Sequence, residues 1–373
     1  MNGNNTKFYA GKLITDKGIP YLDICVSKGT EILFRYFVSK DGKATGKERL
    51  FLFSCTKPLT VVAAMRLIEE GKLSLDDEVE KYLPAFANAF TVNEQGERVP
   101  LKTKMTVRHL FTMSGGLSYN TQTEEICKVK AQTEGKGTTE EFVNAFARTP
   151  LLFNPGERFE YSLCHDVLAA VVEKAVGKRF SQYMQEAVFS PLNMQNTGFH
   201  TESAGMADMY LCQPSGDIKQ IEPHNGLVLS ENYDSGGAGV ISTVDDYVKF
   251  AQALACDGVA NNGYRLIGAE TLKAVRTPQH TAMSVKNSFT CIQGEDYAYG
   301  LGMRTRKNPT EWGLPVGEFG WDGAAGTYLM VDPERKISVV IGMHLMEWPH
   351  VFVGEHLQLV KCLYKDMRAE GLL

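Results

Sequence analysis

The sequence predicts an α+β fold: one antiparallel sheet, built from both ends of the chain and flanked by helices, with an inserted helical region. Two observations lead to this expectation. Strand-like segments gather near both termini, and helical periodicity fills the middle. The 373 residues suffice for two domains or one large one. We expect an α/β domain from residues 1–60 with 260–373, a mainly helical domain from 61–259, and the functional site at their junction.

The expected strands come from two hairpin signals. Residues 23–27 and 30–38 are rich in apolar and aromatic side chains, and Lys28-Gly29 between them is a turn signal. Near the other end, the segments 300–305, 326–331 and 336–343 alternate or run apolar. The turn residues of 331–335 make the last two a second hairpin.

Helices are expected where apolar residues recur at helical spacing or a capping residue opens a run. Ser54 opens one that Gly71 ends, and Thr106 caps another. The expected helices are 6–17, 54–70, 106–113, 138–148, 166–176, 181–189, 243–255 and 356–367. The polar segment 205–234 has few periodic runs. We expect a long irregular surface excursion there, a feature that is usually functional in a compact domain.

Composition and charge argue against several classes of function. The net charge is 39 − 44 = −5 with no basic stripe, so nucleic-acid binding is not expected. No run of 18 apolar residues predicts a membrane span, and the N-terminus lacks a signal peptide pattern. The eight cysteines form no CxxC pair, and the histidines show no ligand spacing. We expect a cytoplasmic protein without metal or cofactor; its oligomeric state is not readable from sequence.

Ser54-Cys55-Thr56-Lys57 is an S-x-x-K tetrad at an expected helix start. Residues i and i+3 share a helical face, so the Lys57 amine can approach the Ser54 hydroxyl. A serine needs an adjacent base to act as a nucleophile, and a lysine serves where burial and a nearby cation or dipole favour its neutral form. On the tetrad alone, a capping serine and a surface lysine explain the pattern too.

Five segments in chain order carry a resemblance to a known family: residues 53–77, 105–117, 154–162, 236–247 and 320–333. Together they resemble the serine β-lactamase and penicillin-binding-protein superfamily, whose class A members share the S-x-x-K motif. The branch that includes class C β-lactamases, family VIII carboxylesterases and D-alanyl-D-alanine peptidases is the most similar. The resemblance covers residues 20–345 and implies a β-lactamase/transpeptidase-like fold and an acyl-enzyme on Ser54.

The same resemblance assigns roles to further residues. Tyr161 becomes the third catalytic group beside Ser54 and Lys57, and a phenol next to a lysine ammonium can relay protons to a leaving group. The backbone amides of Ser54 and Ala324 would form the oxyanion hole, where each donor is typically worth ~3 to 4 kcal/mol in the transition state. Without the resemblance, Tyr161 would equally be a core tyrosine.

The chain departs from the family pattern at two positions. The third motif is Trp321-Asp322-Gly323, with tryptophan where lactamases and peptidases usually have Lys or His; this is similar to family VIII esterases and related acyltransferases. Tryptophan removes a cation that would bind a substrate carboxylate and supplies an apolar wall, unless it is only a packing residue. Leu163 replaces an asparagine that often follows the tyrosine. We expect Trp321, Asp322, Gly323 and Leu163 to contact substrate.

Other chemistries fit less well. His165 and Asp166 follow Tyr161 closely, but a Ser/His/Asp triad would need a G-x-S-x-G elbow, which the chain lacks. Cys55 lies off the face shared by Ser54 and Lys57 and is expected to pack. Our main hypothesis is therefore a carboxylesterase that takes a small-molecule ester or β-lactam-like substrate. The alternatives are a class C-type β-lactamase or D-amino-acid peptidase, and a non-hydrolysing ligand-binding or assembly protein.

Overall fold

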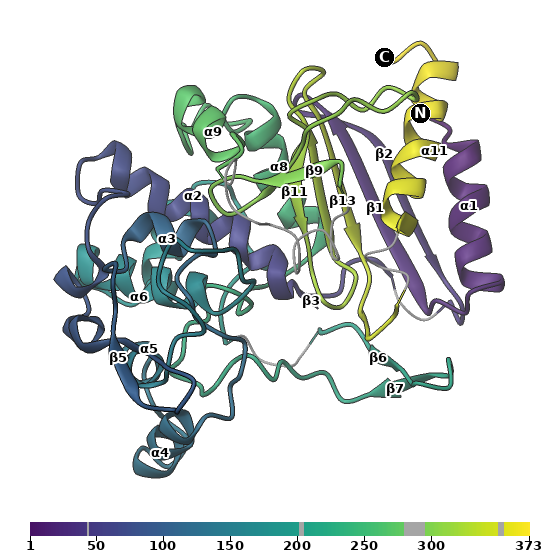
Figure 1. Cartoon of the computed structure of the whole chain (residues 1–373). Coiled ribbons are helices and arrows are strands. Elements are labelled where there is room, and N and C mark those ends of the chain that lie inside the picture. Colours follow the sequence, from purple (N-terminus) through teal and green to yellow (C-terminus); the bar gives the residue numbers. More distant parts are fainter. Residues whose placement is uncertain (43–44, 201–204, 280–294, 350–353) are drawn as a thin grey trace.

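The structure is a computed structural model that describes residues 1–42, 45–200, 205–279, 295–349 and 354–373. Its centre is a seven-stranded antiparallel sheet with the strand order β2-β1-β13-β12-β11-β10-β9 (Figure 1). The strands are β1 (Tyr21–Lys28), β2 (Glu31–Ser39), β9 (Tyr297–Tyr299), β10 (Arg304–Arg306), β11 (Phe319–Asp322), β12 (Tyr328–Asp332) and β13 (Ile337–Gly342).

The sheet joins both ends of the chain, as the sequence predicts. β1 pairs with β13 in a register that places Asp23 opposite Gly342, and both expected hairpins, β1–β2 and β12–β13, are present. Gly29 has φ +58° at the first turn, a conformation that glycine adopts without strain. The expected strand 300–305 is shorter than predicted, because residues 300–303 turn the chain between β9 and β10.

Helices cover both faces of the sheet. α1 (Asn4–Thr15) and α11 (His356–Ala369) lie together on one face, and the two termini are neighbours there (Figure 1). α8 (Val244–Ala255) packs on the other face against β1, β12 and β13. Because α8 comes from the expected helical region, it ties that region to the sheet. The division into two domains stays a prediction.

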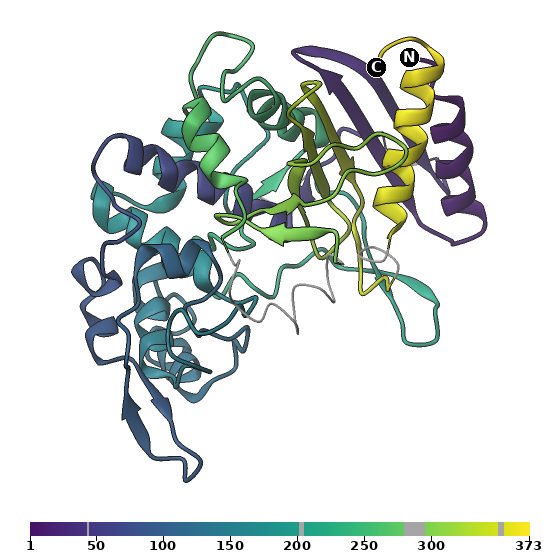
Figure 2. The same cartoon turned by 45° about the horizontal axis from the view of Figure 1, so that its top comes forward.

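The remaining helices are α2 (Thr56–Glu69), α3 (Val107–Phe111), α4 (Glu124–Gln132), α5 (Thr139–Arg148), α6 (Cys164–Val176), α7 (Phe180–Met184) with a π-helical turn at Gln185–Phe189, and α9 (Ala269–Val275), the last of which falls outside the expected helical region of 61–259. The helices expected from periodicity are confirmed, whereas α4 and α9 escaped the sequence analysis. The segment between α2 and α3 contains shorter elements. These are the 3-10 turns Val79–Lys81 and Pro84–Asn88, and a projecting hairpin of β4 (Phe90–Val92) and β5 (Arg98–Pro100) (Figure 2).

Local signals set the helix ends. The Thr138 hydroxyl accepts a hydrogen bond from the Glu141 amide, and the Glu141 carboxylate accepts one from the Thr138 amide, so α5 begins with a capping box. Gly177 ends α6 in the left-handed conformation, with φ +70°. Such signals act over a few residues, which explains why the sequence predicts these ends well.

The segment 205–234 is not the wholly irregular excursion that we expected. It contains the hairpin of β6 (Met209–Cys212) and β7 (Ile218–Ile221), and β6 also pairs in parallel with β14 (Leu345–Met346). β6 and β14 lie far apart in the sequence, and both are short, so periodicity gave no signal. A further two-stranded ladder joins β3 (Leu50–Phe51) to β8 (Ile241–Ser242) beside the start of α2.

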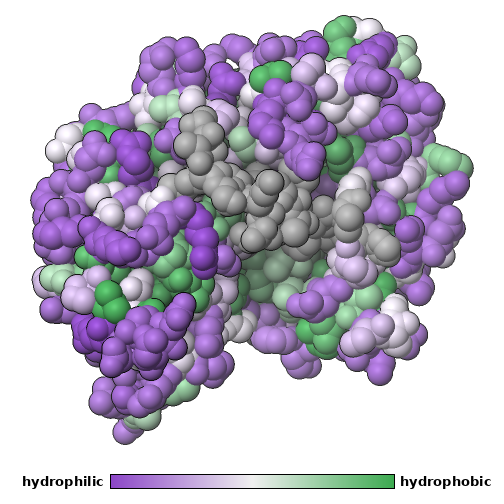
Figure 3. All heavy atoms as spheres, viewed as in Figure 1, coloured by the Kyte–Doolittle hydropathy of each residue, from purple (hydrophilic) through white to green (hydrophobic). Residues whose placement is uncertain are grey.

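The surface is mostly polar on the face seen in Figure 3, and hydrophobic residues show in smaller areas, including the hollowed centre. Within the described residues, no helix combines the length and apolar character that crossing a bilayer requires. No described group of three His, Cys, Asp or Glu side chains is placed to hold a metal ion.

Candidate active site

Ser54 lies in a 3-10 turn, Phe53–Cys55, that leads directly into α2. The preceding residue, Phe53, has φ +46°, which is uncommon for a residue with a large side chain and marks a constrained turn. The Ser54 side chain is 8% exposed, so the surrounding structure covers most of it. The hydroxyl therefore sits at the amino-terminal end of a buried helix, where the helix dipole favours developing negative charge.

Lys57 lies one turn further along and is fully buried. Its Nζ contacts three oxygen atoms: Ser54 Oγ at 3.2 Å, Tyr119 OH at 2.8 Å and the Gly237 carbonyl at 2.8 Å. The expected approach of the Lys57 amine to the Ser54 hydroxyl is therefore present. The carbonyl oxygen can only accept a hydrogen bond, so it fixes the direction of one N–H of Lys57.

Tyr161 lies immediately before α6, and its ring covers the Lys57 amine, with Nζ 4.7 Å from the ring centroid. The Trp321 Nε1–H donates a hydrogen bond of 3.0 Å to the Tyr161 hydroxyl. Trp321 is 2% exposed, and its ring packs edge-on against Tyr299. The structure thus brings Ser54, Lys57, Tyr161 and Trp321 into one cluster from separate parts of the chain.

Tyr119 belongs to the same cluster, although the sequence analysis did not select it. Its ring lies 5.4 Å from that of Tyr161, and its hydroxyl accepts from Lys57 Nζ. Burial raises the pKa of Tyr119 well above its ordinary value, and nearby Tyr161 and Asp166 add to the effect. Tyr119 follows Ser114-Gly-Gly-Leu-Ser in a loop without periodicity. In the sequence, Tyr119 could have been selected only from its position just after residues 105–117, a segment that resembles the family.

Gly323 brings β11 against the turn that carries Ser54. A side chain at this position would collide with the Leu52 carbonyl oxygen, so only glycine allows the approach. The Gly323 amide donates 2.7 Å to the Thr327 carbonyl, which closes the turn between β11 and β12. Ala324, in that turn, is partly exposed beside an apolar cluster that includes Phe53. The predicted oxyanion pair of Ser54 and Ala324 amides thus lies on neighbouring segments.

The structure does not bring Asp322 to the cluster. Side chains alternate along a strand, and Asp322 points to the α11 face, opposite to Trp321. There its carboxylate pairs with Arg304 Nη1 at 2.7 Å and lies 3.3 Å from His356 Nδ1. The predicted substrate contact of Asp322 is therefore replaced by an ion pair inside the fold.

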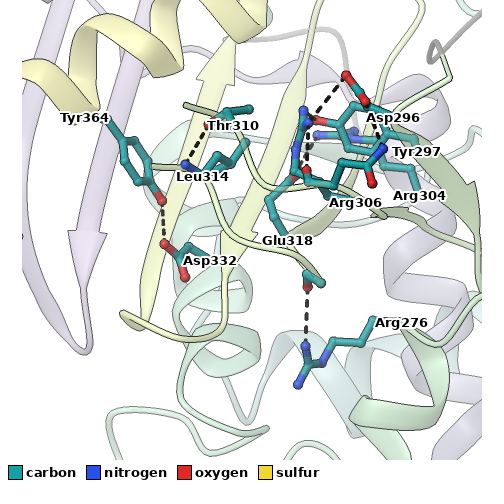
Figure 4. Close-up of polar contacts among 12 residues, drawn as sticks. Arg276, Asp296, Tyr297, Arg304, Arg306, Thr310, Leu314, Glu318, Asp332 and Tyr364 are labelled. Atoms are coloured by element: carbon teal, nitrogen blue, oxygen red, sulfur yellow. Dashed lines mark hydrogen bonds and ion pairs between the residues drawn. The ribbon is translucent and has the colours of Figure 1, made fainter. Parts of the chain in front are cut away.

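Arg304 belongs to a buried charged group at the edge of the sheet (Figure 4). Arg304 Nη2 lies 3.6 Å from Glu318 Oε1, and Arg306 Nε lies 3.4 Å from Glu318 Oε2. Arg306 also donates to Tyr297 OH at 2.6 Å. With Asp322, two carboxylates balance two guanidinium groups, as buried charges require. These contacts hold β10 against β11, the strand that carries Trp321.

Leu163 begins α6 and is 3% exposed. Its amide donates to the Ser118 carbonyl at 3.4 Å, which ties the segment of Tyr161 to the loop of Tyr119. The side chain borders a small pocket between these loops and α4, α5 and Leu151. A substrate contact at Leu163 stays a prediction.

The residues set aside at the sequence level are also placed. Cys55 is fully buried, burial raises the pKa of its thiol, and its Sγ contacts the carbonyl oxygens of Trp321 and Thr327. Burial and the nearby Lys57 lower the pKa of His165 to about 3, so this side chain is neutral. Asp166 binds Tyr233 and Ser235 rather than His165. Cys291 lies outside the described residues.

Comparison with known proteins agrees with this geometry. The family model described as Beta-lactamase matches residues 11–360. Esterase EstB of Burkholderia gladioli is 26% identical over 85% of this chain and 83% of its own length. A putative D-alanyl-D-alanine carboxypeptidase of Escherichia coli K12 is 26% identical over 91% of this chain and 81% of its own length.

A solved structure shows the same fold. EstCE1, described as a hydrolase with promiscuous acyltransferase activity, superposes with a TM-score of 0.78 at 24% identity, over 97% of this chain and 98% of that chain. The fold is therefore β-lactamase/transpeptidase-like. Because the family model spans nearly the whole sequence, the chain belongs to the beta-lactamase family.

Proposed function

We propose that this protein is a carboxylesterase that forms an acyl-enzyme on Ser54. The observation that carries the proposal is the 3.2 Å approach of the buried Lys57 amine to the Ser54 hydroxyl, beneath the ring of Tyr161. Ser54 Oγ attacks the ester carbonyl while Lys57 takes its proton. The alcohol leaves with a proton relayed through Tyr161, and water then releases the acid. The Ser54 and Ala324 amides stabilise the oxyanion.

The three contacts of Lys57 suit the role of a base. In the neutral amine, one N–H points to the Gly237 carbonyl and another can point to Tyr119. The lone pair is then directed at the third partner, the Ser54 hydroxyl. The amine is thus aimed before the substrate binds, which lowers the reorganisation that proton transfer requires.

An ester with an apolar part near the catalytic serine is the favoured substrate class. Trp321 stands where many relatives in the superfamily carry a cation, and its Nε1–H is already used by Tyr161. An apolar cluster also lies beside Ala324. It consists of Phe53, Met209 and Ala325, and the partly buried Ala324, Leu227 and Met346 pack on it. Both features favour apolar groups over a substrate carboxylate.

The test compares the parent with Ser54→Ala on p-nitrophenyl acetate and butyrate. We expect turnover by the parent, an acyl adduct on Ser54 by intact mass, and loss of both in the variant. Ser215→Ala, in the turn between β6 and β7, is the matched control and should keep full activity. Turnover by Ser54→Ala at the parent's rate would refute the proposal.

The alternative is a β-lactamase or D-alanyl-D-alanine carboxypeptidase, which the family and the putative carboxypeptidase among its relatives favour. Nitrocefin and a D-alanyl-D-alanine peptide, assayed beside the esters, separate these activities. We expect the esters to have the highest kcat/KM. A protein whose Ser54 is labelled by neither a fluorophosphonate nor a fluorescent penicillin would instead be a non-hydrolysing member.

A further inference from the structure

Asp166 is a buried carboxylate that the proposed reaction does not use. It lies in the first turn of α6, five residues after Tyr161, and is 1% exposed. The hydroxyls of Tyr233 and Ser235 donate to its Oδ1 at 2.9 and 2.6 Å, and the Gly237 amide also donates to the carboxylate. These hydrogen bonds hold the carboxylate in one position, and they act against the burial that raises its pKa.

The segment 233–238 lies against both Asp166 and Lys57 at Gly237. A Cβ built on Gly237 would lie 2.5 Å from Asp166 Oδ2 and 3.4 Å from Lys57 Nζ. The Gly237 carbonyl accepts from Lys57 Nζ, while its amide faces Asp166. Gly237 thus contacts both the Asp166 carboxylate and the catalytic amine.

Two glycines make this arrangement possible. A side chain at Gly236 would collide with the His165 carbonyl and lie 2.7 Å from Ala169 Cβ, and one at Gly237 would meet Asp166. The Thr60 hydroxyl donates to the Gly236 carbonyl at 2.7 Å, which anchors the segment on α2. The segment is therefore held between α2, through Thr60, and α6, through Asp166.

We propose that Asp166 is a positioning residue for Lys57: it holds the 233–238 segment whose Gly237 carbonyl orients the amine, and its negative charge stabilises the ammonium that forms when Lys57 takes the Ser54 proton. This inference rests on the proposed function. The carboxylate acts through space and through Gly237, and it does not touch the substrate. Its role is comparable to that of the acidic residue that orients and stabilises a catalytic imidazole.

Among the described titratable groups around Lys57, Asp166 is the carboxylic acid, and the others are thiols, phenols and an imidazole. The titratable groups that face Lys57 or Asp166 from the neighbouring elements are Cys55, Tyr119, Tyr161, Cys164, His165 and Tyr233. Burial raises the pKa of Asp166, while Ser235, the Lys57 charge and Tyr233 act against that rise. The neutral His165 supplies no competing positive charge.

The test measures the pH dependence of kcat/KM for p-nitrophenyl butyrate in Asp166→Asn and Asp166→Ser. Loss of the charge removes stabilisation of the Lys57 ammonium, so the acidic limb should move to lower pH by about one unit. The plateau should fall about 10-fold, because a weaker base accepts the Ser54 proton less well. The two neutral variants differ in shape, so a shift that they share reports on charge rather than on packing.

Asp246→Asn is the matched control. Asp246 is also a buried carboxylate, on α8, and it accepts from the Asn196 amide and pairs with Lys249, away from the cluster. We expect it to lower thermal stability but leave the acidic limb in place. Tyr233→Phe removes one hydrogen bond and keeps the charge. We expect the acidic limb of the Tyr233→Phe variant to lie within about a quarter of a pH unit of the parent's acidic limb. This is a fraction of the shift that the loss of a full charge causes.

An acidic limb that stays in place in a neutral Asp166 variant overturns the inference, as does an equal shift in Asp246→Asn. A one-unit shift in Tyr233→Phe overturns it too, because the charge is then not the cause. Failure of the proposed function is distinguishable, since it appears as a parent without Ser54-dependent turnover. A parent that labels and turns over at Ser54, with unchanged limbs in the Asp166 variants, refutes this inference alone.

Discussion

The indole of Trp321 donates a 3.0 Å hydrogen bond to the hydroxyl of Tyr161. The centroids of the two rings also lie 5.5 Å apart, so Trp321 contacts Tyr161 both by ring packing and by a hydrogen bond. The donor at this position is neutral. The donor leaves one lone pair of the phenol oxygen for a proton from the reaction.

Trp321→Phe tests this contact. The ring stays apolar, but the Tyr161 hydroxyl loses its donor, a contact worth about 1 kcal/mol. We expect kcat for short esters to fall about 5- to 10-fold while the fold is kept. Trp312→Phe is the control, because Trp312 packs on Tyr364 in the α11 layer. Equal kcat in Trp321→Phe and the parent would show that the indole only packs.

Tyr119→Phe tests the contact that the sequence analysis missed. The variant leaves one Lys57 N–H without its acceptor in a buried site, which costs about 1–3 kcal/mol. We expect a fall of about 10-fold or more in kcat/KM, measured with p-nitrophenyl butyrate. In the control Tyr264→Phe, the lost hydrogen bond goes to the Ala187 carbonyl in another part of the fold, so kcat/KM should hold. A loss of equal size in both variants would contradict a specific role for Tyr119.

Glu173 should give the stability of the protein a pH dependence near neutrality. Burial raises the pKa of Glu173 to about 7, above the ordinary value of 4.5 for a glutamate side chain. Between these values the folded chain keeps a proton that the unfolded chain releases, so this contribution is full below pH 4.5 and is lost as the pH rises to 7. We expect Glu173→Gln to flatten this decline in urea unfolding measured from pH 4.5 to 8.

Glu186→Gln, on the surface beside Lys178, is the control for that measurement. Its pH dependence should match that of the parent. If Glu173→Gln keeps the parent's decline, the carboxyl is not protonated in the folded state.

Gly11→Ala should stabilise the protein. Gly11 lies inside α1, and a Cβ there would meet no atom within 4 Å. Alanine is favoured over glycine in a helix by about 1 kcal/mol, largely through the entropy of the unfolded chain. We expect a higher midpoint in thermal or urea unfolding. Gly236→Ala should have the opposite effect, because its methyl group would collide with the His165 carbonyl. We expect its unfolding midpoint to be lower than the parent's. A lower midpoint for Gly11→Ala would refute the argument.

The parts that the sequence predicted are those with short-range causes. Helix caps at Thr138 and Gly177 and the turn at Gly29 act within a few residues, and the five motif segments carry the family's pattern. The contact between Lys57 and Ser54 follows from the spacing of one helical turn. The place of Tyr161 beside Ser54 and Lys57 followed from the resemblance, because nothing in the spacing alone brings Tyr161 to α2.

The features that differ from the prediction depend on contacts between distant parts of the chain, on the alternation of side chains along a strand, or on the path of a loop. β6 forms through pairing with β7 and with the distant β14, which no local pattern shows. The expected substrate contact of Asp322 rests on its place between Trp321 and Gly323. The two-residue period of a strand instead places Asp322 opposite to Trp321, where its carboxylate pairs with Arg304. Tyr119 depends on the path of a loop, and periodicity says nothing of such paths.

The pairing of β1 with β13 joins residues more than three hundred positions apart. During synthesis, Ser54, Lys57 and Tyr161 leave the ribosome long before β11 and β13 exist. Trp321 and the Ala324 amide reach the nucleophile only when the last strands add to the first hairpin. Folding should accordingly be slow, since the chain must close its widest loop before the sheet is complete. A nascent chain that ends before β11 carries Ser54 and Lys57, our proposed nucleophile and base, but only one of the two amides that we propose for the oxyanion hole.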